Sequence, residues 1–123
     1  NHAVGLAVVH LVSVPKRRKK VLIGTVRDRI FEIFGELAIE KDWKIRALEV
    51  APDHIHLFVE VHPTDAIFQV VKAFKGRSAN YLRKEFEHLR RLPSLWTNSY
   101  FFSTAGNVSA DTIERYISDP HHG

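Results

Sequence analysis

The chain has 123 residues, of which 45% are hydrophobic and 26% are charged. This length suits one compact core and is short for two domains, and the composition argues against wholesale disorder. Lys and Arg number 18 against 14 Asp and Glu, so the formal net charge is +4, which favours a polyanionic partner only weakly. Cysteine is absent, which excludes disulfide scaffolds, thiolate zinc sites and cysteine nucleophiles.

The first half of the chain predicts a strand, a helix and a hairpin. Residues 6–14 are rich in β-branched side chains and predict a buried strand. The basic run Lys16–Lys20 follows, and residues 25–41 carry apolar side chains at the spacing of an amphipathic helix. Residues 44–50 and 54–61 predict two strands joined by a turn.

The second half predicts a helix and a strand. Thr64 is expected to cap a helix that extends to about Phe86, with Gly76 as an interruption. Residues 99–104 are rich in aromatic and hydroxyl side chains, which favours a further strand.

These elements follow the order β-α-β-β-α-β, with one more helix at about 109–118 that Ser109 is expected to cap. The order predicts an α+β protein with a ferredoxin-like fold, in which two helices cover one face of a four-stranded antiparallel sheet. We expect one domain over residues 1–123. Because the longest apolar stretch is well short of about 18 residues, we expect a cytoplasmic protein.

His54-Ile55-His56 is the first candidate for chemistry. Alternate residues of a strand point to the same face, so both imidazoles would lie side by side while Ile55 enters the core. Two neutral imidazoles at this spacing can share one metal ion. Two solvent-facing histidines without a metal would give the same pattern.

Tyr116 is the second candidate. Ile113 and Ile117 share its predicted helical face, so a tyrosine that packs in the core is one interpretation. The other is a nucleophile. A tyrosine hydroxyl is weakly acidic and needs an activated electrophile, such as a phosphodiester polarised by a metal ion on two histidines.

Two groups of basic residues are candidates for binding nucleic acid. They are Lys16, Arg17 and Arg18 in the basic run and Lys72, Lys75, Arg77 and Arg83 along the second predicted helix. Aromatic side chains near them could stack on unpaired bases. A solvated charged face is the alternative interpretation of each group, and the pattern does not separate DNA from RNA.

Several motifs, taken in order, resemble one family. They lie at Val9–Leu22, Leu48–Val59, Phe74–Ser78, Leu95-Trp96 before Ser99-Tyr100, and Ile113–Ile117. Together they cover nearly the whole chain, which resembles the single-tyrosine transposases of prokaryotic insertion sequences. These form the IS200-like family of the His-hydrophobic-His (HUH) nuclease superfamily. The resemblance favours the metal site and the nucleophile over their alternatives.

The resemblance implies a homodimeric enzyme that recognises DNA hairpins at transposon ends and cleaves and rejoins single-stranded DNA. It implies that Tyr116 is the nucleophile, which forms a 5′-phosphotyrosine link and leaves a free 3′-hydroxyl. It also implies that His54 and His56 hold Mg²⁺ or Mn²⁺. The tyrosine helix can come from the partner subunit in this family, with Gly106-Asn107 as the hinge region here.

The sequence departs from the family at one metal ligand. Members commonly carry Gln four residues after the tyrosine, where this chain has Pro120, which offers no ligating side chain. Asp119, His121 or water could substitute. An inactive or domesticated relative, or a non-enzymatic module that binds single-stranded nucleic acid, is the alternative. A replication-initiation or relaxase domain would share the chemistry, but the compact chain favours a stand-alone transposase.

Overall fold

A computed structural model describes residues 7–98 and 101–106 of the chain. Their elements are, in chain order, β1 (Ala7–Ser13), the 3-10 helix η1 (Lys16–Arg18), α1 (Gly24–Lys41), β2 (Lys44–Ala51), β3 (His54–Val61), α2 (Ile67–Glu85), the 3-10 helix η2 (Glu87–Arg91) and β4 (Phe101–Gly106). No helix among these residues is long and apolar enough to cross a membrane.

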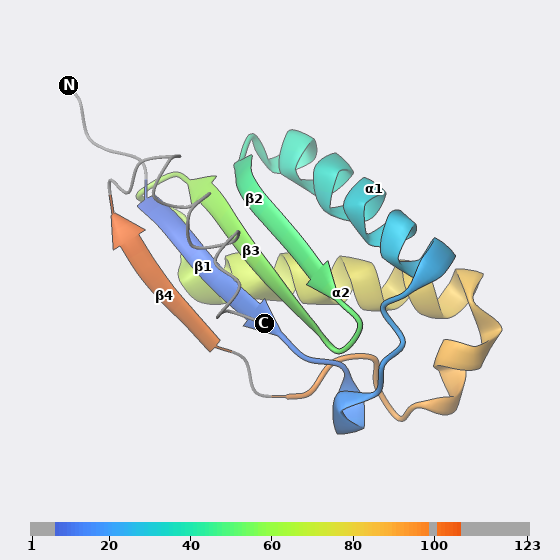
Figure 1. The fold of residues 1–123 in the computed structure, drawn as a ribbon. Coiled ribbons are helices and arrows are strands. Elements are labelled where there is room, and N and C mark those ends of the chain that lie inside the picture. Colours follow the sequence, from blue (N-terminus) through green and yellow to red (C-terminus); the bar gives the residue numbers. More distant parts are fainter. Residues whose placement is uncertain (1–6, 99–100, 107–123) are drawn as a thin grey trace.

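The strands form one antiparallel sheet in the order β2-β3-β1-β4 (Figure 1). A short turn joins β2 to β3, while α1 carries the chain from β1 to β2 and α2 carries it from β3 toward β4. This connectivity is the split β-α-β arrangement that the sequence predicts. The predicted α+β class, with an antiparallel sheet and two helices, is confirmed.

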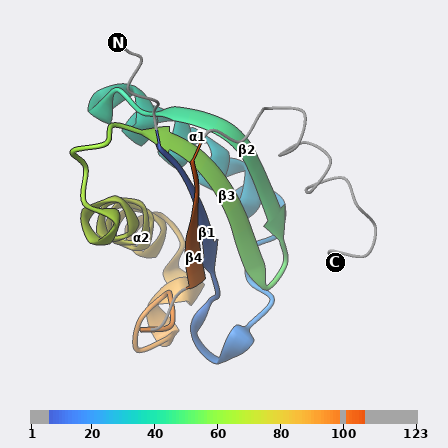
Figure 2. The same cartoon turned by 90° about the vertical axis from the view of Figure 1, so that its left-hand side faces the viewer.

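Both helices pack on the same face of the sheet (Figures 1 and 2). Alternation along β3 explains this, because Ile55, Leu57 and Val59 are at most 1% exposed and belong to the core cluster. The core faces of α1 and α2 contribute Ile30 and Phe74, which are also fully buried. The side chains between the buried positions of β3 therefore point to the opposite face of the sheet.

The predicted start of α2 is wrong. The helix begins at Ile67 after Ala66, and no side chain caps it. Thr64 lies instead in a turn, where Asp65 donates its backbone N–H to the carbonyl of His62. The Asp65 carboxylate accepts hydrogen bonds from the Trp43 indole at 2.8 Å and from the His62 N–H at 3.0 Å, so a contact with a residue distant in sequence fixes this turn.

Two further predicted boundaries change. Gly76 does not interrupt α2, which continues through it to Glu85, because a missing side chain weakens a helix without preventing its backbone hydrogen bonds. Of the strand predicted at residues 99–104, residues 101–104 are observed in β4, which continues to Gly106 and pairs with β1, while residues 99 and 100 lie outside the described residues. The helix predicted at 109–118 lies outside the described residues.

Candidate metal centre

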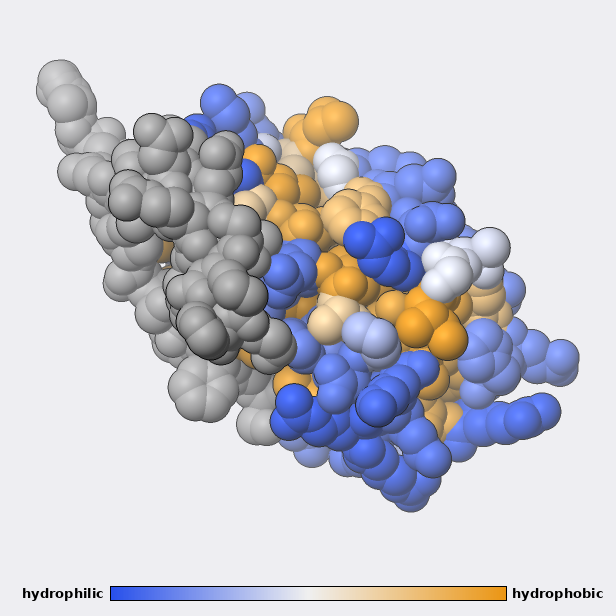
Figure 3. Space-filling view, viewed as in Figure 1, coloured by the Kyte–Doolittle hydropathy of each residue, from blue (hydrophilic) through white to orange (hydrophobic). Residues whose placement is uncertain are grey.

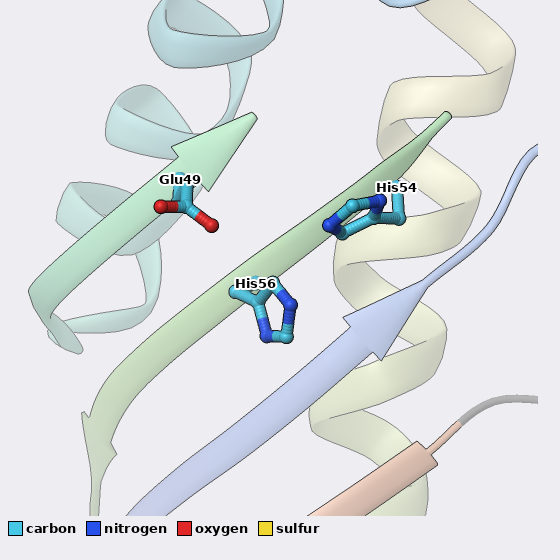
Figure 4. A group of neighbouring side chains, drawn as sticks. All are labelled: Glu49, His54 and His56. Carbon is cyan, nitrogen blue, oxygen red and sulfur yellow. The ribbon is translucent and has the colours of Figure 1, made fainter. Parts of the chain in front are cut away.

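Three side chains gather on the face of the sheet opposite the helices (Figure 4). His54 and His56 come from β3, and Glu49 comes from β2, where the hairpin register places it directly across from His56. One potential ligand atom from each of these three residues lies within 4.8 Å of the other two, and all three side chains are partly buried. The structure therefore places both predicted metal ligands together and adds a carboxylate that sequence reasoning missed.

The donor set fits a divalent cation. Two imidazoles and one carboxylate on one side of an ion leave further positions open for water or substrate. Ligand bonds of about 2.1 Å place two ligand atoms at most about 4.2 Å apart, so small side-chain rotations would close the present spacing. A mixed nitrogen and oxygen set suits Mn²⁺ better than Mg²⁺, because Mg²⁺ prefers oxygen ligands.

His54 is held by the residue before it. Its Nδ1 atom lies 2.8 Å from one oxygen of the Asp53 carboxylate, and the other carboxylate oxygen accepts a hydrogen bond from Arg18 Nε at 3.0 Å. The hydrogen bond from His54 and the adjacent Arg18 guanidinium keep the pKa of Asp53 below its ordinary value. The Asp53 side chain is 20% exposed and that of Arg18 is 68% exposed, so this chain of contacts leads from the site to the surface.

His56 has a second histidine beside it. The Nε2 atom of His10, from the neighbouring strand β1, lies 3.1 Å from Nδ1 of His56. The His10 ring also stacks on Phe58, with centroids 4.2 Å apart and an angle of 8° between the planes. These contacts limit rotation of the His56 ring, as the partners of metal-binding histidines commonly do.

The basic run lies at the same end of the sheet as this cluster. Its flanks are fixed by two backbone hydrogen bonds, from Lys16 N–H to the carbonyl of Leu95 and from Leu22 N–H to the carbonyl of Pro52. The hydrophilic surface in the lower part of Figure 3 lies where Figure 1 draws η1. Lys16, Arg17 and Arg18 form η1, and Arg18 contacts Asp53, the residue before His54.

Trp96 connects the residue before the basic run to helix α2. Residues Pro15 and Trp96 form an isolated antiparallel bridge, and the Trp96 indole donates to the hydroxyl of Ser78 in α2 at 2.9 Å. Trp96 is 5% exposed and Ser78 is fully buried. The segment before β4 is therefore anchored to α2, and the start of the basic run is anchored to that segment.

The predicted cations of α2 lie on the helix side of the sheet, away from the histidines. Arg77 forms an ion pair with Glu40 of α1 at 2.7 Å, and Arg83 donates to the carbonyl of Leu92 at 3.1 Å. Both contacts are internal to the protein. The structure therefore does not bring these two arginines together with the basic run.

Two of the lysines of α2, Lys72 and Lys75, share a pocket lining with the aromatic side chain of Phe68. Lys72 Nζ lies 6.0 Å from the ring centre of Phe68, which is 62% exposed. Lys75 Nζ donates to the carbonyl of Thr97 at 2.7 Å, and burial lowers the pKa of Lys75. A shallow pocket of about 220 Å³ includes both lysines and Phe68 in its lining.

Tyr116, the predicted nucleophile, lies outside the described residues, as do Asp119, Pro120 and His121, the positions considered for a third ligand. Glu49 could have been found from the sequence by one further step. The turn at Pro52-Asp53 pairs Ala51 with His54 in the hairpin, and counting back two residues pairs Glu49 with His56. Cross-strand partners share a face of the sheet.

Fold and site together define a class, namely α+β proteins that carry two histidines and a carboxylate as a candidate divalent-metal centre on an antiparallel sheet. The family profile described as "Transposase IS200 like" matches residues 3–120. The chain is 33% identical over 115 residues to the ISDra2 transposase TnpA of Deinococcus radiodurans, which covers 91% of this chain and 82% of that protein. The chain therefore belongs to the IS200-like transposase family, whose members are enzymes that cleave DNA and transfer its strands.

Other relatives agree with this membership. The transposase for insertion sequence element IS200 of Salmonella typhimurium is 30% identical over 111 residues, which cover 88% of this chain and 72% of that protein. The crystal structure of a candidate transposase from Deinococcus radiodurans matches 100% of this chain and 97% of its own, with a TM-score of 0.78 and 32% identity. A REP-associated tyrosine transposase bound to a REP hairpin matches 97% of this chain and 69% of its own, with a TM-score of 0.64 and 18% identity, and so shares the fold.

Proposed function

We propose that this transposase cleaves and rejoins single-stranded DNA at insertion-sequence ends through a covalent 5′-phosphotyrosine on Tyr116. His54, His56 and Glu49 would hold the divalent ion, Mg²⁺ or Mn²⁺, beside the scissile phosphate. The observation that carries this proposal is the juxtaposition of the two histidines and the carboxylate, with ligand atoms within 4.8 Å of one another, on the sheet of an IS200-like transposase.

Glu49 resolves the departure at Pro120. The carboxylate faces His56 across the hairpin, so it could supply a third ligand without any contribution from the segment after Tyr116. A carboxylate also supplies negative charge, which two neutral imidazoles lack and which a hard divalent cation favours. We propose Glu49 as the third ligand in place of Asp119, His121 or a water molecule.

The chemistry would be a transesterification at phosphorus. The Tyr116 oxygen forms a bond to the scissile phosphorus, the bond from phosphorus to the 3′ oxygen breaks, the tyrosine gives up its proton, and the 3′ oxygen gains one. A bound divalent ion would supply charge stabilisation to the phosphate oxygens as the reaction proceeds. In the reverse sense, a 3′-hydroxyl attacks the phosphotyrosine and releases Tyr116, so the strands rejoin without an external energy source.

The DNA partner and the oligomeric state are part of the same proposal. We propose DNA hairpins at transposon ends as the partner, because the REP-associated transposase that shares this fold is bound to a hairpin. Lys16, Arg17, Lys72, Lys75, Arg77 and Arg83 are proposed contacts to nucleic acid. A homodimer would allow two ends to be joined. Light scattering in the presence of a hairpin oligonucleotide should give the mass of two chains plus the bound DNA, and the mass of one chain plus DNA would contradict this part.

Covalent capture tests the proposed function directly. The protein is incubated with Mn²⁺ and a pool of labelled single-stranded hairpins with randomised flanks, and adducts are separated on a denaturing gel. We expect a DNA adduct that peptide mass spectrometry maps to Tyr116. Substituting Tyr116→Phe should abolish the adduct, and His56→Ala should reduce it at least tenfold because the phosphate then lacks a properly held ion.

Tyr81→Phe provides the matched control, since Tyr81 lies in α2 on the helix side of the sheet and should form the adduct at the wild-type level. An undiminished adduct in Tyr116→Phe would refute the assignment of the nucleophile. Hairpin binding by the wild-type protein without any adduct, in Mn²⁺ or Mg²⁺, would favour the inactive relative or the non-enzymatic binding module instead.

A further inference from the structure

We propose that Asp53 and Arg18 are positioning residues for His54, and that they fix the tautomer and orientation of its ring so that Nε2 is the atom presented to the metal. The proposal rests on the metal centre of the proposed function and extends it to two residues that do not contact the ion. It also assigns Arg18 a positioning role, whereas its neighbours Lys16 and Arg17 are proposed to bind nucleic acid.

The first step is the tautomer of His54. Its Nδ1 atom lies 2.8 Å from an oxygen of the Asp53 carboxylate. An ionised carboxylate can only accept a hydrogen bond, so Nδ1 must carry the proton. The lone pair of the neutral ring is then on Nε2, which is the nitrogen able to bind a cation. Histidines that bind metals commonly donate their other N–H to a carboxylate in this way.

The second step is the orientation of Asp53. Its two oxygens are divided between two partners, because one accepts from His54 and the other accepts from Arg18 Nε at 3.0 Å. Rotation of the carboxylate would break both hydrogen bonds. The nearby backbone is also tied, since Leu22 N–H donates to the carbonyl of Pro52 at 3.0 Å.

The third step is the backbone of the basic run. Arg17 and Arg18 have φ values of 59° and 53°, in the left-handed region that costs a side-chain-bearing residue about 1–2 kcal/mol. Neither residue is buried, so packing of their side chains in the core does not explain this conformation. In this conformation the exposed Arg18 side chain places its guanidinium against the Asp53 carboxylate.

A simpler interpretation is that Asp53 only stabilises the turn between β2 and β3. The two interpretations differ in what they predict for the folded protein. A turn residue affects stability alone, while a positioning residue affects the state of the His54 ring and the affinity for metal. The experiment must therefore measure the tautomer of His54 and the affinity for metal in variants that remain folded.

The test combines two measurements on the wild-type protein and on Asp53→Ala, Asp53→Asn and Arg18→Ala. In metal-free protein labelled with ¹⁵N-histidine, long-range ¹H–¹⁵N spectra report which nitrogen of His54 is protonated. Titration with Mn²⁺, followed by electron paramagnetic resonance, gives the affinity. We expect wild-type His54 to be protonated on Nδ1 and Asp53→Ala to mix tautomers and lose about 10–100-fold in Mn²⁺ affinity.

Two further variants should have smaller effects on Mn²⁺ affinity than Asp53→Ala. Asp53→Asn retains an oxygen acceptor, so it should keep the Nδ1–H tautomer and recover part of the lost affinity. Arg18→Ala should lower the affinity less than Asp53→Ala and in the same direction. Glu40→Gln is the matched control, because it removes an ion pair of similar length, with Arg77, on the helix side of the sheet, and it should change neither measurement.

An unchanged His54 tautomer together with wild-type Mn²⁺ affinity in folded Asp53→Ala would overturn the proposal. If that variant does not fold, wild-type values of both measurements in Arg18→Ala would do so. Failure of the proposed function is distinguishable, because a wild-type protein that binds no Mn²⁺ refutes the metal centre. The tautomer spectra of the metal-free proteins would still decide whether Asp53 and Arg18 position the ring.

Discussion

Glu49 faces His56 across β2 and β3, and its substitution gives a direct test of the third ligand. Glu49→Gln keeps the size of the side chain and removes its charge. We expect Mn²⁺ affinity to fall about tenfold or more, because charge count is a main determinant of affinity for hard cations. Isothermal titration calorimetry with Mn²⁺ measures the change, and circular dichroism establishes that the variant is folded.

Glu60→Gln is the control for that measurement. Glu60 also belongs to β3 and points to the same face as the histidines, but it pairs with Arg46 at 3.4 Å and does not belong to the cluster. Its substitution should leave Mn²⁺ affinity unchanged. Wild-type affinity in Glu49→Gln, with binding lost in His56→Ala, would show that another group supplies the third ligand.

The alternation of buried and exposed residues along a strand was sufficient to predict that His54 and His56 share a face. It was not sufficient to predict the residues that surround them. Ile55 is 1% exposed between two partly buried histidines, as expected for a strand with one face in the core. Glu49 required the register of the hairpin as well. The contact between Arg18 and Asp53 depends on left-handed backbone angles at two arginines, and residues other than glycine and asparagine give little sequence signal for such angles.

The sequence predicted the helices and strands best where hydrophobic periodicity within the segment determines them. The helix predicted at 25–41 is observed at Gly24–Lys41, and the strand predicted at 54–61 is observed at those residues, because hydrophobic periodicity sets both. The start of α2 was not predictable in this way. The hydrogen bond between Trp43 and Asp65 fixes the preceding turn, and it joins residues far apart in the sequence.

The two helices are joined by a bidentate ion pair that should make stability depend on pH. Arg29 of α1 donates from Nε and Nη2 to the two oxygens of Glu85 in α2, at 2.7 and 3.0 Å. The hydrogen bond from Arg29 lowers the pKa of Glu85. Glu85→Gln should therefore lower the free energy of unfolding at pH 7, by no more than about 1 kcal/mol because Glu85 is partly exposed.

The sign of the pH dependence follows from the lowered pKa. The stabilisation is complete above the carboxyl pKa of the unfolded chain, which is about 4.3, and is lost as the pH falls through the lower pKa of the folded state. The difference in melting temperature between wild type and Glu85→Gln should be largest at neutral pH and shrink below about pH 4. Glu32→Gln, on a weaker and more exposed partner of Arg29, should show a smaller effect, and a difference independent of pH would contradict the role of the ion pair.

For the whole molecule, the location of charge matters more than its sum. The formal net charge of +4 is modest, and part of the positive charge is already paired internally, as in the contacts of Arg29 and Arg77 with glutamates of α1 and α2. The basic run Lys16–Lys20 is instead concentrated beside the turn at Pro52 and Asp53. A DNA strand that reaches the metal centre would pass close to these cations.

Two lysine pairs that carry equal charge separate location from net charge. Lys19 and Lys20 are exposed at the end of the sheet near the metal centre, whereas Lys41 and Lys44 are exposed at the opposite end of β2. Each double substitution to alanine lowers the net charge by two. Since each phosphate contact contributes about 0.7 to the salt dependence of single-strand binding, loss of two contacts should lower the slope by about 1.4.

We expect that decrease for Lys19→Ala with Lys20→Ala, and a slope close to wild type for Lys41→Ala with Lys44→Ala. Fluorescence anisotropy of a labelled single-stranded oligothymidine, titrated at several NaCl concentrations without divalent ions, provides the slope of log affinity against log salt. Equal decreases in both double variants would mean that the strand responds to the overall field of the protein. A decrease confined to the first pair would place the backbone of the strand along the basic run, within reach of His54 and His56.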